Sequence, residues 1–97
     1  MKDSEPKISR FQAFVHGRVQ GVGFRQYTSE RATSLGLNGF VRNQWDRTVE
    51  VVAEGPEKDI NEFLVWLHTG PPFARVTQVD VHWQAPTGEI TGFEVSC

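Results

Sequence analysis

The chain has 97 residues, of which 38% are hydrophobic and 23% are charged. These fractions are ordinary for a globular protein, and the length suits one domain with a modest core. The formal net charge of −2 argues against a broad nucleic-acid-binding surface but permits a small local anion site.

The ends of the chain give little sign of export or membrane attachment. The only cysteine is the last residue, Cys97, so no disulfide framework is expected. Residues 1–10 lack the apolar segment of a secretory signal, and no apolar run approaches the about 18 residues of a membrane-spanning helix. We therefore expect a cytoplasmic protein in which residues 1–7 form a flexible tail and residues 8–97 form a single domain.

The first predicted strand covers about residues 8–16, because apolar residues alternate along it and would share one face. These residues are Phe11, Ala13 and Val15. A helix is predicted over residues 24–35, ended by Gly36 in a left-handed cap with Leu37 supplying the accompanying hydrophobic contact. Its expected inner face contains Phe24, Tyr27, Arg31 or Ala32, and Leu35.

Four further strands and one helix are predicted after residue 36. The predicted elements are a strand over residues 37–42, a connection over residues 43–47, a strand over residues 48–53, a helix from Gly55-Pro56-Glu57 to Gly70, and strands over residues 76–83 and 90–96. Pro56 is expected at the first position of the helix. Apolar residues at i, i+3, i+4 and i+7 predict its buried face. They are Ile60, Phe63, Leu64 and Leu67.

The order βαββαβ with a terminal strand predicts an α+β, ferredoxin-like sandwich, with an antiparallel sheet and two helices on one face. Right-handed crossovers make the first and second strands parallel, with the third between them. The ends of strands one and two then share one edge of the sheet. The last strand returns toward this edge, which would bring the carboxylate of Cys97 near Arg25.

The glycine-interrupted stretch from Gly17 to Arg25 joins the first strand to the first helix. Glycines allow a ligand to approach backbone amides closely, and the first N–H groups of a helix favour an anion. An arginine in the first turn adds a planar group suited to phosphate oxygens. The alternative is a tight connection whose glycines serve the turn alone.

Arg25 and Asn43 are the two candidate catalytic side chains, because the predicted topology brings them together. A guanidinium with backbone amides can hold a phosphoryl group, and a side-chain amide can hold a water beside it. Phosphoryl transfer asks mainly for positioning and charge stabilisation. In the alternative interpretation, Arg25 pairs with a carboxylate and Asn43 only starts the hairpin turn.

Other polar and aromatic residues give weaker signals. The three histidines and Cys97 lack the spacing of metal ligands, so no metal site is expected. His16 adjoins the loop and is either an acid or base of the reaction or a structural residue. Trp45 adjoins Asn43 and either contacts substrate or has no function. The acidic residues are expected on solvated faces. They include Glu50, Glu54, Glu57, Asp59 and Glu62.

Two segments carry a resemblance to a known family. The stretch from Gly17 to Arg25 resembles the first signature of the acylphosphatase family. Gly39-Phe40-Val41-Arg42-Asn43, followed by Val49-Glu50-Val51 and Gly55-Pro56, resembles its second. Both occur at the family's spacing, and the similarity extends from about Ile8 to the end of the chain. The family usually has a glycine where this chain has Arg47. If that position needs positive φ, Arg47 either costs about 1 kcal/mol or relocates the turn.

The resemblance implies a small enzyme that hydrolyses acyl phosphates to a carboxylate and inorganic phosphate without a cofactor. It implies that Arg25 and the loop amides bind phosphate and that Asn43 orients the attacking water. The substrate-binding residues of the loop are then Val19, Gln20, Gly21, Val22, Gly23 and Phe24. We expect a monomer that binds a small acyl phosphate and inorganic phosphate, and neither nucleic acid nor membrane.

Two other functions fit parts of the pattern. A module that senses phosphate without turnover would use the same loop, and only an activity assay separates it from an enzyme. An RNA-binding domain can share the βαββαβ order, but it displays aromatic residues on strands in a basic setting. Here Gly23-Phe24-Arg25 opens a helix and the overall charge is acidic, which disfavours RNA binding.

Overall fold

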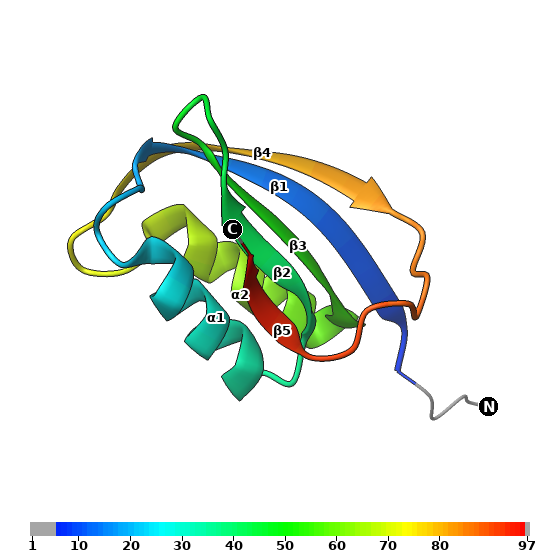
Figure 1. The fold of residues 1–97 in the computed structure, drawn as a ribbon. Helices are drawn as coiled ribbons and strands as arrows, with labels where there is room; N and C mark the ends of the chain where they lie inside the picture. The colour runs from blue at the N-terminus through cyan, green and yellow to red at the C-terminus, as the bar shows by residue number, and fades with distance from the viewer. Residues whose placement is uncertain (1–5, 97) are drawn as a thin grey trace.

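The computed structural model describes residues 6–96, which form one five-stranded sheet and two helices (Figure 1). The elements are β1 (Ile8–Arg18), α1 (Phe24–Ser34), β2 (Asn38–Asn43), β3 (Val49–Pro56), α2 (Glu57–Thr69), β4 (Arg75–Gln84) and β5 (Phe93–Ser96). The strand order is β4-β1-β3-β2-β5, and both helices cover the same face of the sheet. The predicted ferredoxin-like arrangement is confirmed. The sheet is mixed rather than wholly antiparallel, because β5 pairs parallel to β2.

The hydrophobic core lies between this sheet face and the helices. The alternating residues of β1 lie opposite those of β3, in the pairs Phe11–Ala53, Ala13–Val51 and Val15–Val49. All six side chains are fully buried, as the alternation predicts. α2 covers them with Ile60, Phe63 and Leu67, which are also fully buried, while Leu64 is only partly buried. The apolar periodicity of α2 therefore predicts its inner face correctly.

The inner face of α1 differs from the predicted one. Its buried residues are Phe24, Thr28 and Ala32, whereas Tyr27 is 42% exposed. Residues four apart lie above one another on a helix, so these three form a single stripe toward the sheet. Thr28 and Ala32 are small, and Thr28 is also polar, so neither gives a strong apolar signal. For this reason the apolar pattern of the sequence indicates Tyr27, next to Thr28, as an inner residue.

Gly36 and Pro56 lie at helix boundaries, one as predicted and one displaced. Gly36 has φ +71°, and its N–H and that of Leu37 donate hydrogen bonds to the last turn of α1, which confirms the left-handed cap. Pro56 is the last residue of β3 rather than the first of α2, with ψ 137°. The proline ring fixes φ but not ψ, so pairing with Ile8 of β1 keeps Pro56 extended.

The described residues begin at Pro6, so the predicted tail over residues 1–7 lies mostly outside them. The carbonyl oxygen of Lys7 accepts a hydrogen bond from the Glu57 N–H at 2.8 Å, and the two side chains form an exposed ion pair. Lys7 is thereby attached to the first residue of α2. Neither of the two helices in residues 6–96 is long and apolar enough to cross a membrane.

Glu50 and Glu54 are buried, which contradicts the expectation that these acids are solvated. They are 4% and 7% exposed, on the face of β3 that points away from the helices. Glu54 accepts hydrogen bonds from Arg10 and from the backbone N–H groups of Thr87 and Gly88. Burial raises the pKa of Glu54, but these hydrogen bonds outweigh it, and the pKa lies below its ordinary value of 4.5. Glu54 therefore attaches the β4–β5 connection to the sheet.

Arg47 occupies the hairpin between β2 and β3 with φ +77°, and it is the one non-glycine residue at positive φ in the described chain. Its N–H donates to the Gln44 carbonyl oxygen at 3.1 Å. Asp46 accepts hydrogen bonds from the hydroxyl and the N–H of Thr48, and these lower the pKa of Asp46. The turn therefore keeps the left-handed geometry, with arginine in place of the family's glycine.

The first prediction concerns this strained position. Arg47→Gly should raise the free energy of unfolding by about 1 kcal/mol, because glycine adopts positive φ without steric cost. Thermal and denaturant unfolding measure the gain. Arg47→Ala is the matched control, since it removes the same side chain but keeps the strain. An equal gain in both variants would show that backbone strain is not the cause.

The second prediction concerns Glu54. Its carboxylate stabilises the fold fully above the ordinary pKa of 4.5, and this contribution is lost as the pH falls through the lower folded pKa. Glu54→Gln should therefore lower the free energy of unfolding at pH 7 by about 2 kcal/mol. The difference from the wild type should shrink as the pH falls below 4.5. Urea unfolding at several pH values tests this, and a constant difference would contradict it.

Candidate active site

The ends of β1 and β2 lie at the same end of the sheet, because both strands run antiparallel to β3 (Figure 1). The β1–α1 loop follows β1, and the β2–β3 hairpin follows β2. A pocket of about 190 Å³ is bordered by the β1–α1 loop, the start of α1, the last residue of β2 and β5. It is lined by Val19, Gly21, Gly23, Phe24, Arg25, Gln26, Asn43 and Val95. The structure therefore brings together the glycine loop, Arg25 and Asn43, as the topology predicts.

The loop begins at a β-bulge in β1. The pairing with β4 shifts register between His16 and Gly17, and Gly17 has φ +121°. A Cβ atom at Gly17 would lie 2.0 Å from the Arg75 carbonyl oxygen, so no other residue fits there. After the bulge, β1 stays paired with β4 through Arg18, and the loop to α1 follows.

The N-terminus of α1 faces the pocket without a side-chain cap. Gly23 is the N-cap residue, with φ +77°, and no side chain in the described residues caps the helix. The first intrahelical bond joins the Tyr27 N–H to the Gly23 carbonyl oxygen, so the N–H groups before it have no helical partner. The first turn contains no acidic residue. This end of the helix therefore favours a bound anion.

Three side chains of the predicted substrate-binding loop pack into or against the hydrophobic core. Val19 and Phe24 are 1% exposed within the core, and Val22 packs partly against it. These side chains fix the loop to the domain. These three residues can then contact an anion only through their backbone N–H groups. The interpretation of the loop as an anion site requires contacts of this kind.

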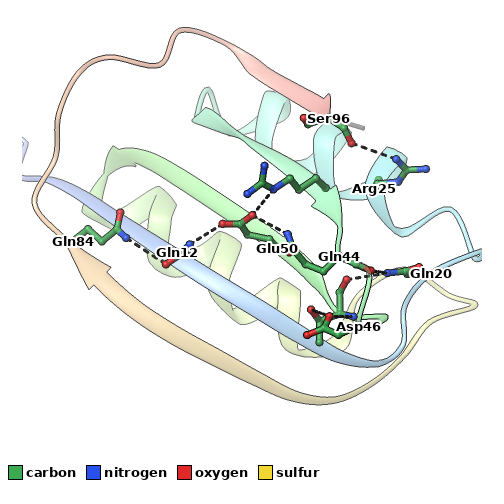
Figure 2. Close-up of polar contacts among 10 residues, drawn as sticks. Gln12, Gln20, Arg25, Gln44, Asp46, Glu50, Gln84 and Ser96 are labelled. Carbon is green, nitrogen blue, oxygen red and sulfur yellow. Dashed lines mark hydrogen bonds and ion pairs between the residues drawn. The ribbon is translucent and has the colours of Figure 1, made fainter.

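Arg25 lies in the first turn of α1, where it is partly buried and faces β5. Its Nη1 donates to the carbonyl oxygen of Ser96 at 3.4 Å (Figure 2). β5 runs parallel to β2, which confirms that the last strand returns toward the loop. The predicted contact of the Cys97 carboxylate lies outside the described residues. The backbone of β5 thus helps to orient the guanidinium.

Asn43 ends β2 and lies opposite Val49 of β3. Its side-chain oxygen Oδ1 is buried and accepts no hydrogen bond from the described residues. A buried amide oxygen without a partner is costly, and such groups are usually satisfied by a water or a ligand. Since Asn43 also lines the pocket, its side-chain amide lies where a water could be held.

Two pocket residues and one side-chain contact are absent from the sequence-based prediction, which names Gln20 only as a substrate-binding residue of the loop. Gln26 and Val95 line the pocket, and the side chain of Gln20 bonds to the β2–β3 hairpin. The return of the last strand to this edge is the signal that could have indicated Val95. No local pattern indicates the contact of Gln20, because its partners lie 24 and 28 residues later in the sequence.

His16 and Trp45 do not join the residues that line the pocket. His16 Nε2 lies 2.8 Å from Asp80 Oδ2, so it forms a pair on the sheet surface. Hydrogen bonds from Gln78 and His16 lower the pKa of Asp80. Trp45 is 96% exposed at the hairpin. Of the two interpretations of His16, the structural one agrees with this geometry.

Comparison with known proteins now adds independent information. The family model described as Acylphosphatase matches residues 11–95. An acylphosphatase of Thermococcus kodakarensis is 51% identical over 84% of this chain and 88% of its own length. One of Cupriavidus metallidurans is 53% identical over 78% of this chain and 80% of its own length.

A solved structure agrees with these sequence matches. The crystal structure of acylphosphatase from Bacillus subtilis has a TM-score of 0.88 and 35% sequence identity, over 92% of this chain and 99% of that one. The family model covers both the glycine loop and the hairpin, and the relatives and the solved structure match most of the chain. The resemblance inferred from the two signatures is therefore confirmed: the chain belongs to the acylphosphatase family.

Proposed function

We propose that this acylphosphatase-family enzyme hydrolyses the carboxyl–phosphate bond of an acyl phosphate, giving a carboxylate and inorganic phosphate, at the pocket bordered by the β1–α1 loop, the start of α1, Asn43 and β5. One observation carries the proposal. Arg25, the uncapped N-terminus of α1 and the unpartnered buried oxygen of Asn43 meet at a single pocket. The first two suit a phosphoryl group, and the third suits a water next to it.

The residues divide into a group that binds phosphate and a group that handles water. The backbone amides of residues 17–23 and the guanidinium of Arg25 hold the phosphoryl oxygens and stabilise their charge in the transition state. Asn43 accepts a hydrogen bond from the water through Oδ1 and orients its lone pair toward phosphorus, in line with the departing oxygen. The carboxylate leaves without a general acid, because it is already a weak base.

This mechanism asks for no metal ion and no organic cofactor, so we expect turnover to persist in EDTA. A single domain over residues 8–97, a monomeric state and a cytoplasmic location stay predictions. A protein that binds phosphate without turnover would use the same contacts. Release of phosphate from acetyl phosphate, a simple acyl phosphate, distinguishes the two functions, and no release by the wild type would refute the proposed one.

The third prediction tests the role of Arg25. Arg25→Lys should lower kcat/KM about 100-fold or more and weaken inhibition by inorganic phosphate, because an ammonium cannot reproduce the two parallel donors of a guanidinium. Steady-state kinetics with acetyl phosphate measure both effects. Arg31→Lys is the control on the same helix, since Arg31 forms an exposed pair with Glu62. Near-normal kinetics of Arg25→Lys would contradict the binding model.

The fourth prediction separates water from phosphate. Asn43→Ala should lower kcat on the order of 100-fold and leave the inhibition constant of inorganic phosphate within about twofold, because Asn43 is assigned to the water. The exposed Asn61 of α2 provides the control substitution, Asn61→Ala. Equal losses of kcat and of phosphate affinity would instead make Asn43 a phosphate contact or a structural residue.

A further inference from the structure

The side chain of Gln20 joins the β1–α1 loop, which lines the pocket, to the β2–β3 hairpin, which directly follows the pocket residue Asn43. Its amide nitrogen Nε2 donates to the carbonyl oxygen of Gln44 at 2.8 Å and to that of Thr48 at 3.0 Å (Figure 2). Gln20 itself belongs to the β1–α1 loop, next to the buried Val19. Within residues 6–96, these are the only hydrogen bonds recorded between residues 17–23 and the hairpin residues 44–48.

The two acceptors of Gln20 lie at the base of the hairpin, next to Asn43. The Gln44 N–H donates to the Thr48 carbonyl oxygen at 2.8 Å and closes the hairpin there. Gln44 follows Asn43 directly in the sequence. A displacement of the hairpin base relative to the loop would therefore move Asn43 relative to the phosphate-binding amides.

Glu50 holds Gln44 from the opposite side. This carboxylate of β3 is 4% exposed, and it accepts hydrogen bonds from Gln44 Nε2 at 3.0 Å, Gln12 Nε2 at 2.7 Å and Arg42 Nε at 2.5 Å (Figure 2). Gln44 is thus fixed through its side chain by the sheet and through its backbone by Gln20. The hydrogen bond to Glu50 holds the hairpin on the sheet, and the hydrogen bonds of Gln20 hold the loop against the hairpin.

We infer that the side chain of Gln20 is a positioning residue, which sets the distance and direction between the water on Asn43 and the phosphate in the loop. This inference rests on the proposed function. In-line attack is sensitive to displacements of about 1 Å, which can reduce the rate on the order of 100-fold. Gln20 thereby has two roles: its backbone belongs to the phosphate-binding loop, and its side chain aligns that loop with Asn43.

The hairpin does not depend on Gln20 to satisfy its own carbonyl groups. The Thr48 oxygen keeps the hydrogen bond from the Gln44 N–H, and the Gln44 oxygen keeps that from the Arg47 N–H. Loss of the Gln20 amide therefore leaves neither acceptor unsatisfied. We expect the fold to survive the loss, so that an effect on turnover reports alignment rather than unfolding.

The variant Gln20→Met tests the inference, because methionine has a similar length and no donor. We expect kcat with acetyl phosphate to fall about tenfold or more, while the inhibition constant of inorganic phosphate changes less than about twofold. Gln20→Asn should lower kcat in the same way as Gln20→Met, because the shorter asparagine side chain does not reach the two carbonyl oxygens of the hairpin. The control is Gln78→Met, since within residues 6–96 the exposed side chain of Gln78 donates a hydrogen bond to Asp80 alone. An unchanged kcat, or a parallel loss of phosphate affinity, would overturn the inference.

A double-mutant cycle shows whether Gln20 acts through Asn43. If it does, the variant with both Gln20→Met and Asn43→Ala should be no slower than Asn43→Ala alone, because no water remains to be aligned. Multiplied losses would mean that Gln20 acts independently, which contradicts its role as a positioning residue. Thermal unfolding of all variants checks that the compared proteins are folded.

A titration with inorganic phosphate tests the link between loop and hairpin without turnover, so that a failure of this inference can be distinguished from a failure of the proposed function. Absence of turnover in the wild type would refute the function but not the link between loop and hairpin. Inorganic phosphate should then shift the amide resonances of Gln44 and Thr48 in NMR spectra of the wild type, and much less in Gln20→Met. Equal shifts in both proteins, or none in the wild type, would refute the link.

Discussion

The antiparallel pairing of β3 with both of its neighbours is the constraint from which the site follows. β1 and β2 each pair with β3, so their chain directions agree and their last residues lie at one end of the sheet. Arg25 and Asn43, which belong to different elements, are thereby brought to one pocket. The buried pairs along β1 and β3 supply the hydrophobic energy that holds this register.

The two faces of β3 contribute different kinds of stability. The face toward the helices carries Val49, Val51 and Ala53, which pack without directional preference. The other face carries Glu50 and Glu54, each satisfied by several donors from neighbouring segments. Hydrogen bonds to a buried carboxylate are directional, so this second face determines how the hairpin and the β4–β5 connection lie on the sheet.

Local patterns in the sequence predict most of the fold, and contacts between distant segments account for what they miss. Alternation identifies the buried residues of β1, and the apolar spacing of α2 identifies its inner face. The inner face of α1 is identified only in part: the prediction includes Phe24 and offers Ala32, but it contains the exposed Tyr27 and misses the polar Thr28. The burial of Glu50 depends on donors from two other strands and the hairpin, which no local pattern reveals.

The site could be predicted to the level of its main side chains. The expected topology and the two family signatures place Arg25 and Asn43 at one edge, and the structure brings them to one pocket. The bonds of Gln20 could not be inferred, because they depend on where a side chain of the loop lies relative to backbone atoms of the hairpin.

The contact between Arg25 and Ser96 affects how the protein can be joined to other molecules. β5 ends beside the pocket, whereas β1 begins at the opposite end of the sheet (Figure 1). A tag, linker or fused domain attached after residue 97 would begin within a residue of this contact, where it can obstruct substrate entry. An attachment before residue 8 starts from the far end of β1. The N-terminal side is therefore the suitable point for immobilising the enzyme or fusing it to a partner.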